Sequence, residues 1–330
     1  MSVELFPVSQ VIVVGGTGQT GHRLLMRLCD VRPHAKVYAT SRTVGEDGFP
    51  SGDHPQLVKD HFHEWKTKVS WHGLNLEADG RTLKERLRSL GLSLDPKAST
   101  VLLFSAAFTN VEVCETDPPK CNLVNEQNTI AVLQWARRLF NAKLVFYSTD
   151  YVFDGQDGPY SESDSKNPLS QYGRSKAVVE EWLERNAPEA SLILRTTGVY
   201  DYLPGSKNFL MQMLDLWSQG KTTRIPADQF ANPTWADDLA RATLELIAAG
   251  SSGVFHVAGA SHLARHEFAR LIAKVFGCQE SLILPVRTNE LHQKARRPLK
   301  GGLKTEKLEA KLGWAPAGVQ KVLEYFKTSF

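Results

Sequence analysis

The sequence predicts an α/β fold, a doubly wound parallel sheet with a smaller discontinuous lobe that is mostly C-terminal. Short apolar runs alternate with segments of helical spacing along the first half of the chain. Strands that are buried on both faces and separated by helices form parallel sheets. The least regular segments are 43–67, 152–169, 200–233 and 281–305. The last three follow the later strands, where ligands of open α/β sheets bind, so we expect them to build the smaller lobe.

The individual elements follow from the same runs. The predicted strands, in chain order, are "QVIVVG" (10–15), "KVYATS" (36–41), "VSWHGL" (69–74), "TVLLFSAA" (100–107) and "AKLVFYST" (142–149). The predicted helices lie near 18–31, 82–90, 119–140, 171–186 and 264–276. The first helix carries Leu24, Leu25 and Leu28, which is the spacing of one buried helical face.

The composition is that of an ordinary globular protein. The 330 residues are 42% hydrophobic and 23% charged, and the formal net charge is +3. So small a charge does not favour nucleic acid as a partner. The N-terminus lacks a basic region with a long apolar core, and no apolar run approaches the roughly 18 residues of a membrane span, so we expect neither a signal peptide nor a membrane segment. The four cysteines form no C-x-x-C pair, which is typical of reduced thiols in a cytoplasmic protein.

A glycine-rich turn, "GGTGQTG", joins the first strand to the first helix. Its Gly15, Gly18 and Gly21 allow a tight turn and a close approach of the backbone to a pyrophosphate at the positive end of a helix. A purely structural turn can have the same spacing. The strand before it and the helix after it favour a bound dinucleotide.

The end of the second strand indicates which dinucleotide. Proteins that bind NAD commonly carry an acidic residue there, which accepts hydrogen bonds from the adenosine ribose. This chain has Ser41 and Arg42 instead. A hydroxyl and a guanidinium suit a 2′-phosphate, which a carboxylate would repel. The alternative is that Arg42 is a solvated surface residue, and we favour NADP(H) as the cofactor.

Polar residues end the strand "AKLVFYST" and recur at the start of a later helix. Ser148, Thr149 and Asp150 close the strand, and Tyr172 and Lys176 lie four residues apart in "YGRSK". That spacing places a phenol and an ammonium on one helical face. A tyrosine transfers a proton near neutral pH only when its anion is stabilised, and a neighbouring lysine does this.

These motifs together resemble the extended branch of the short-chain dehydrogenase/reductase superfamily. The chain is most similar to its dTDP-4-dehydrorhamnose reductases and related sugar-nucleotide enzymes. The motifs that carry the resemblance, in order, are "GGTGQTG", "SAAFTNVEVCE", "LVNEQNT", "YSTDYVFDG", "YGRSK", "LRTTGVY", "NFL", "DQFANPTWADDLA", "FHVAG", "HEFARLIA" and "ARRP". They cover almost the whole chain and imply a Rossmann-type sheet.

The resemblance also implies roles for individual residues. Thr149 would bond the substrate oxygen, Tyr172 would protonate it, and Lys176 would tune Tyr172 and hold the nicotinamide ribose. Cofactor contacts would come from Gly15, Thr17, Gly18, Gln19, Thr20, Gly21, Ser41, Arg42, Asn75, Leu76, Ala106, Ala107 and Lys176. Substrate contacts would come from Phe108, Thr149, Tyr151, Tyr172, Asn208 and Arg297. Asn125 is expected to support the geometry of the fourth strand.

The same resemblance divides the chain into domains. The NADP-binding domain is expected to cover 1–199 and about 234–257, and the substrate-binding lobe 200–233 and 258–330. Gly198 departs from the family, which usually has a tryptophan there close to the sugar, and so leaves the rhamnose-type substrate open. His54, His61 and His63 lie in a segment longer than the family's, and without neighbouring cysteines or paired carboxylates we expect no metal site.

Three functions remain open at this point. The first is an NADPH-dependent reductase of a keto group on a 4-keto-6-deoxy sugar nucleotide. The second is an epimerase or dehydratase of the same superfamily, although Tyr151 stands where dehydratases tend to place a second acid. The third is a non-catalytic subunit resembling the regulatory subunit of methionine adenosyltransferase. We expect a small-molecule substrate, neither nucleic acid nor membrane as partner, and leave a homodimer open.

Overall fold

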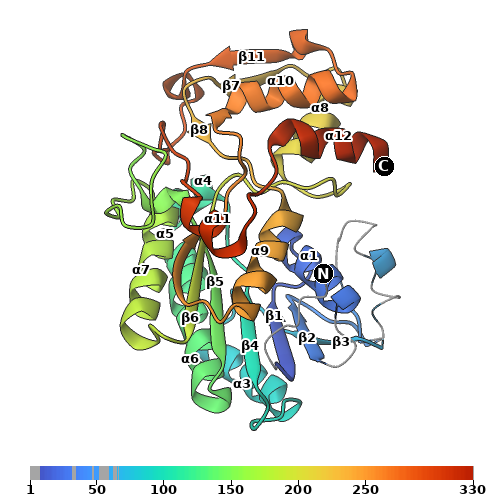
Figure 1. The fold of residues 1–330 in the computed structure, drawn as a ribbon, viewed down its shortest axis with the longest axis vertical. Helices are drawn as coiled ribbons and strands as arrows, with labels where there is room; N and C mark the ends of the chain where they lie inside the picture. The colour runs from blue at the N-terminus through green and yellow to red at the C-terminus, as the bar shows by residue number, and fades with distance from the viewer. Residues whose placement is uncertain are drawn as a thin grey trace.

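A parallel sheet forms the centre of the molecule. The computed structural model describes residues 8–31, 35–46, 48–51, 59–61, 65 and 67–329. Its main sheet has seven strands in the order β3-β2-β1-β4-β5-β6-β9, and every neighbouring pair is parallel. The strands are β1 (Gln10–Val14), β2 (Lys36–Ser41), β3 (Val69–Gly73), β4 (Thr100–Phe104), β5 (Lys143–Thr149), β6 (Ser191–Thr196) and β9 (Gly253–His256). The predicted doubly wound sheet is confirmed (Figure 1).

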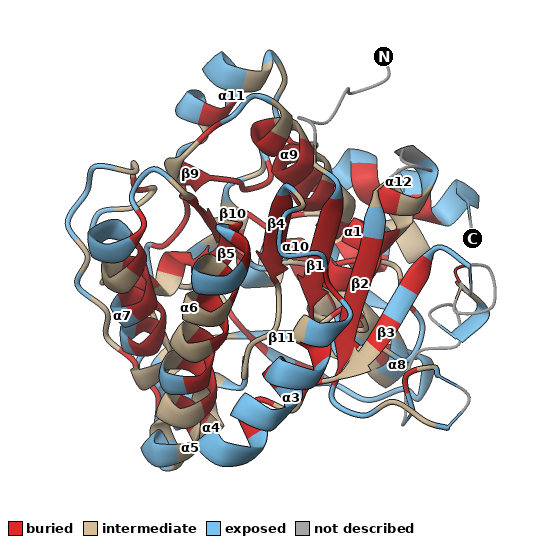
Figure 2. Cartoon of the chain, turned by 90° about the horizontal axis from the view of Figure 1, so that it is seen from below, coloured by how far each residue is buried: buried red, intermediate tan, exposed pale blue. Residues whose placement is uncertain are grey.

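Helices cover both faces of this sheet. On one face α1 (Gln19–Val31) packs beside α9 (Ala236–Ala248), and on the other lie α3 (Gly80–Leu92), α6 (Thr129–Phe140) and α7 (Gln171–Asn186). Side chains along β1 point alternately to the two faces of the sheet. Val11 and Val13 join the core under α1 and α9, and Ile12 and Val14 join the core under α3, α6 and α7. Figure 2 shows the strands mostly buried between helices whose outer sides are exposed.

A smaller group of elements lies beyond the carboxyl ends of the strands. It contains α8 (Phe209–Ser218), α10 (Arg265–Phe276) and α12 (Val319–Ser329), which share a third hydrophobic core with a parallel pair of strands, β7 (Thr223–Pro226) and β11 (Ile283–Val286). A short antiparallel pair, β8 (Phe230–Ala231) and β10 (Leu263–Ala264), lies nearby. Figure 1 shows these elements above the sheet. One C-terminal helix, α11 (Glu306–Leu312), packs instead against α9 and β9.

The helical stretch predicted near 119–140 is present, but it is not one uniform α-helix. The structure has α4 (Val111–Thr116) and α5 (Pro118–Asn122), then a π-helical turn over Leu123–Asn128, and then α6. The side chains of Asn125 and Asn128 explain the turn, because they bond to backbone groups in the loops after β4 and β3. A π-helical turn inserts the extra residue that such an inward reach requires.

The segments predicted to be irregular also contain regular structure. Segment 200–233 holds α8, β7 and β8, and segment 281–305 holds β11. The strands predicted over 10–15 and 100–107 end earlier, at Val14 and Phe104, so that Gly15 and Ala106 lie in loops. Over the described ranges, no helix is long and apolar enough to span a bilayer.

Candidate active site

The glycine-rich turn forms a cradle between β1 and α1. Gly15 has φ +85°, a conformation that side chains disfavour, and its amide donates to Thr40 Oγ1 at 3.2 Å. A Cβ on Gly21 would stand 2.1 Å from the Gly15 carbonyl oxygen, and one on Gly15 would stand 2.9 Å from the Ala106 Cβ. A larger residue at either position would therefore clash with its neighbour and disrupt the tight turn. Gly18 is exposed in this turn, and Thr17, Gln19 and Thr20 are half-buried.

The neighbouring strand ends extend this cradle. Ser41 ends β2, and its buried hydroxyl has no hydrogen-bond partner in the described chain. The Arg42 side chain follows it and is 74% exposed. Asn75 and Leu76 follow β3, and Ala106 and Ala107 follow β4. An open cradle, an unpartnered hydroxyl and an available guanidinium at adjacent strand ends fit a phosphorylated dinucleotide.

Thr149 and Tyr172 meet at the end of β5. Thr149 is buried, its Oγ1 accepts from the Tyr151 amide at 3.2 Å, and it also contacts Asp150 Oδ1 at 3.3 Å. The Tyr172 phenol is a neighbour of Thr149, which lowers the pKa of Tyr172 and so partly opposes the effect of burial. The helix α7 that carries Tyr172 is capped by Ser170, which accepts from the Gly173 amide at 3.2 Å. A Cβ on Gly173 would stand 2.1 Å from the Tyr151 carbonyl oxygen, so only glycine allows α7 to come this close.

Lys176 lies behind this pair, one turn along α7. Its Nζ donates to the Tyr147 carbonyl oxygen at 2.9 Å and lies 4.6 Å from the centre of the Phe146 ring. Burial lowers the pKa of Lys176 to about 8, and the carboxylate of Glu180 opposes this shift. The ammonium is thus fixed against β5, on the same helical face as Tyr172.

The surroundings raise the pKa of Tyr172 rather than lower it. Burial is the largest cause, and the negative charge of Asp150 adds to it. Lys176 is not among the groups that shift this pKa in the free protein, and its predicted role toward Tyr172 stays a prediction. A protonated phenol next to a hydroxyl-bearing strand end can donate a proton.

Asp150 also belongs to the site, although it was assigned no role there from the sequence. It is almost fully buried, accepts from Thr197 Oγ1 at 2.8 Å, and lies close to the backbone of Gly302, which lowers its pKa. Burial raises the pKa of Asp150 to about 6, and these hydrogen bonds reduce the shift. Asp150 therefore ties the end of β5 to the end of β6 and to the C-terminal loop.

Two arginines approach Tyr151 from the smaller lobe. Arg297 donates to the Tyr151 hydroxyl at 3.3 Å and to Glu112 at 2.8 Å, while its buried Nε has no partner in the described chain. Arg265 lies 4.5 Å from the centre of the Phe209 ring and interacts electrostatically with both Tyr151 and Arg297. Arg265 was missed from the sequence, because it stands alone at the start of α10 and only the fold brings it near Arg297.

Two other predicted substrate residues have partners within the chain. Asn208 caps α8 by accepting from the Met211 amide, and its own amide donates to the Asp201 carbonyl oxygen and to Ser206. Phe108 is held by Asn125, which bonds both its amide and its carbonyl oxygen. The supporting role predicted for Asn125 agrees with these contacts.

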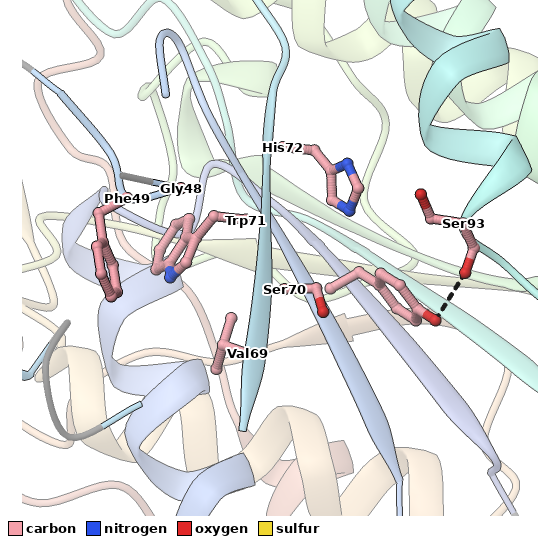
Figure 3. Close-up of a pocket in the computed structure, with 8 residues that line it drawn as sticks. Gly48, Phe49, Val69, Ser70, Trp71, His72 and Ser93 are labelled. Atoms are coloured by element: carbon pink, nitrogen blue, oxygen red, sulfur yellow. Dashed lines mark hydrogen bonds between the residues drawn. The ribbon is translucent and has the colours of Figure 1, made fainter. Parts of the chain in front are cut away.

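A hollow of about 490 Å³ lies away from these groups, along the edge strand β3. Figure 3 shows Phe49, Val69 and Trp71 on one side of the strand and Ser70 and His72 on the other. None of the triad residues lines it. The described ranges contain no group of three metal-ligating side chains. His61 contacts His22 at 3.0 Å, while His54 and His63 lie outside the described residues.

Comparison with known proteins relates this site to a family. The model of the RmlD substrate binding domain matches residues 9–328. SpsK of Bacillus subtilis, a spore coat polysaccharide biosynthesis protein, is 36% identical over 212 residues, which is 64% of this chain and 73% of that protein. A dTDP-4-dehydrorhamnose reductase of Burkholderia thailandensis is 33% identical over 245 residues, covering 69% of this chain and 81% of that enzyme.

A solved structure has the same fold over its whole length. The dTDP-4-dehydrorhamnose reductase of Bacillus anthracis, determined in complex with NADP, superposes with a TM-score of 0.77 at 23% identity. The alignment covers 98% of this chain and 100% of that one.

Proposed function

Because the chain belongs to the RmlD substrate binding domain family, we propose that it is an NADPH-dependent reductase that acts on a keto group of a sugar nucleotide. The observation that carries the proposal is the bond from Lys176 Nζ to the Tyr147 carbonyl oxygen, which holds the start of α7, with Tyr172, near Thr149 at the end of β5. The glycine cradle after β1 lies at the same edge of the sheet. The relatives named as dTDP-4-dehydrorhamnose reductases support a 4-keto-6-deoxy sugar linked to a nucleoside diphosphate as the substrate.

The strand ends would hold the cofactor. The cradle of Gly15, Gly18 and Gly21 takes the pyrophosphate, and Ser41 and Arg42 take the 2′-phosphate. The remaining proposed cofactor contacts are Thr17, Gln19, Thr20, Asn75, Leu76, Ala106 and Ala107. NADPH, when bound, supplies the hydride that the reduction requires.

The triad would handle the substrate oxygen and its proton. Tyr172 Oη donates a proton to that oxygen, and the pKa raised by burial and Asp150 keeps the proton available until then. The contact between Thr149 and Asp150 is long at 3.3 Å, so the threonine hydroxyl can turn to the substrate oxygen. Lys176 stabilises the tyrosinate that remains after the proton has left.

The smaller lobe would bind the rest of the substrate. The proposed lobe covers 200–233 and 258–330 apart from α11, which packs against α9 and β9, and the proposed NADP-binding domain covers 1–199 and about 234–257. Arg297 and Arg265 supply two positive charges beside Tyr151, and the unpartnered Nε of Arg297 can donate to a phosphate oxygen. Asn208 acts by capping α8 and so positions the start of that helix.

Replacing the proposed acid tests this function directly. Tyr172→Phe removes the donated proton and leaves the ring, so we expect kcat to fall about 10²- to 10⁴-fold while the Kd of NADPH changes little. Turnover is followed by NADPH oxidation with a keto sugar nucleotide, and binding by fluorescence titration. The matched control is Tyr325→Phe, which alters an exposed tyrosine on α12. Wild-type kcat in Tyr172→Phe would show that another group supplies the proton.

A further inference from the structure

A carboxylate stands between two cations beside the proposed 2′-phosphate site. Glu77 follows β3, and its Oε2 lies 3.0 Å from Lys120 Nζ. Its other oxygen, Oε1, lies 3.9 Å from Arg42 Nη2. Neither Glu77 nor Lys120 belongs to a motif that indicates cofactor binding. Glu77 nevertheless contacts Arg42, the residue on which selection of NADPH would depend, and Lys120 contacts Glu77.

The fold places Glu77 there through neighbouring strands. β2 and β3 pair in parallel with Ser41 opposite Gly73, so Arg42 and the residues after β3 leave the sheet at the same edge. The Glu77 amide donates to Asn75 Oδ1 at 2.9 Å, which folds the chain back after the strand. Asn128 also bonds the carbonyl oxygens of Leu76 and Ala78 on either side. The backbone that carries Glu77 is therefore fixed.

We propose that Glu77 is a specificity-determining residue that opposes Arg42 and limits the preference of this chain for NADPH over NADH. The inference rests on the proposed cofactor site at the ends of β1, β2 and β3. A 2′-phosphate that approaches Arg42 also approaches the negative charge of Glu77, which repels it. A 2′-hydroxyl carries no charge and can donate a hydrogen bond to the same carboxylate.

Lys120 sets how strongly Glu77 opposes Arg42. The 3.0 Å contact to Lys120 is shorter than the 3.9 Å contact to Arg42, so the lysine holds the carboxylate partly away from the guanidinium. Lys120 itself is on α5, and its Nζ lies 5.2 Å from the centre of the Phe108 ring. Without Lys120, the Glu77 carboxylate would have only Arg42 as a positively charged partner and would pair with it more closely. The two residues should therefore affect NADPH binding in opposite directions.

Cofactor titration of single variants tests this arrangement. Glu77→Gln keeps the shape and removes the charge, so the Kd of NADPH should fall about three- to tenfold, and the Kd of NADH should stay the same or rise. Lys120→Met should raise the Kd of NADPH and leave that of NADH nearly unchanged. At high salt the gain from Glu77→Gln should shrink, because these charges are partly exposed and screened. Fluorescence titration or calorimetry reads all of these without turnover.

Two further variants separate the possible failures. Glu85→Gln removes a carboxylate from the exposed Arg81–Glu85 pair on α3 and should leave both Kd values unchanged. Arg42→Ala should weaken NADPH and spare NADH, which tests the proposed cofactor site alone. Suppose that Arg42→Ala weakens the binding of NADPH alone, while Glu77→Gln leaves the Kd of NADPH unchanged or raises it. The role proposed for Glu77 is then wrong. If Arg42→Ala weakens both cofactors equally, the proposed 2′-phosphate site itself is wrong.

Discussion

Tyr172 has a pKa raised above that of an ordinary phenol, so it is protonated in the free protein at neutral pH. Burial and the nearby carboxyl of Asp150 both raise its pKa, and Lys176 behind it has its own pKa lowered by burial to about 8. A reductase needs a proton donor before the substrate is reduced and a stabilised anion afterwards. The free protein has the donor form, and Lys176 can stabilise the anion when it forms.

Another residue with a strongly shifted pKa lies away from the site. His256 on β9 is fully buried, and its Nε2 lies 3.4 Å from Arg195 Nη1. Burial, followed by the charge of Arg195, lowers the pKa of His256 to about 3. As the pH falls through about 6.5, His256 is therefore protonated in the unfolded chain but stays neutral in the folded chain. The stability that neutral His256 provides is present above pH 6.5 and is lost as the pH falls toward 3.

This histidine should produce a measurable acid sensitivity. Between pH 7 and pH 5 the wild type should lose about 2 kcal/mol more of its free energy of unfolding than His256→Gln does. Urea titrations at the two pH values give both numbers. His292→Asn, which replaces an exposed histidine with φ 49°, serves as the control. Equal losses in the wild type and His256→Gln would contradict the lowered pKa.

Sequence spacing predicted those site residues that lie close together in the chain. Tyr172 and Lys176 share one helical turn, so their common face was visible without the fold. Glu77, Lys120 and Arg42 come from three separate segments, and only the parallel pairing of strands brings them together. Arg265 was missed for the same reason. The role of Asp150 depends on burial, which the letters "STDYVF" do not show.

At the scale of elements, α7 depends on one close approach. Gly173 lets the start of this helix contact the backbone of Tyr151, and Tyr172 and Lys176 are placed by that contact. The helix could move away from β5 only by carrying both side chains with it. The position of the triad is therefore set by a residue that takes no part in the chemistry.

Gly173→Ala should show this positioning role. Its Cβ would stand 2.1 Å from the Tyr151 carbonyl oxygen, so the helix must shift. We expect a loss of about 1–3 kcal/mol in the free energy of unfolding and a large fall in kcat, with the Kd of NADPH much less affected. Gly80→Ala is the control, because a Cβ there meets nothing within 4 Å. Wild-type kcat in a folded Gly173→Ala protein would contradict the role.

The alternation of strands and helices was predictable, and the exceptions have physical causes. Apolar runs predicted β1 to β5 because parallel strands are buried on both faces. The π-helical turn was not visible because an apolar helical pattern continues through 119–140. The helix α8 was not predicted, because the polar residues around it made the segment 200–233 look irregular. Asn208 nevertheless is an ordinary capping residue for the start of a helix.

Across the whole molecule, a buried ion pair connects the two parts. Arg23 on α1 forms two bonds to the buried carboxylate of Asp201, at 2.5 and 2.7 Å, just before α8 begins. Arg27 on the same helix forms a partly exposed pair with Asp237 at the start of α9, which holds these two helices together on the sheet. The helix that follows the glycine cradle is thus tied to the segment that leads into the smaller lobe. This places the proposed cofactor and substrate sites on one connected framework.

Isotope transfer tests the proposed reaction most directly. The protein is incubated with a dTDP-linked 4-keto-6-deoxy sugar and with NADPH that carries deuterium at both positions of nicotinamide C4. The account predicts that NADPH is oxidised and that the sugar nucleotide gains a single deuterium on the carbon that bore the keto group, and that Tyr172→Phe abolishes both changes. A protein that binds NADPH yet transfers no deuterium to any keto sugar nucleotide tested would contradict the account.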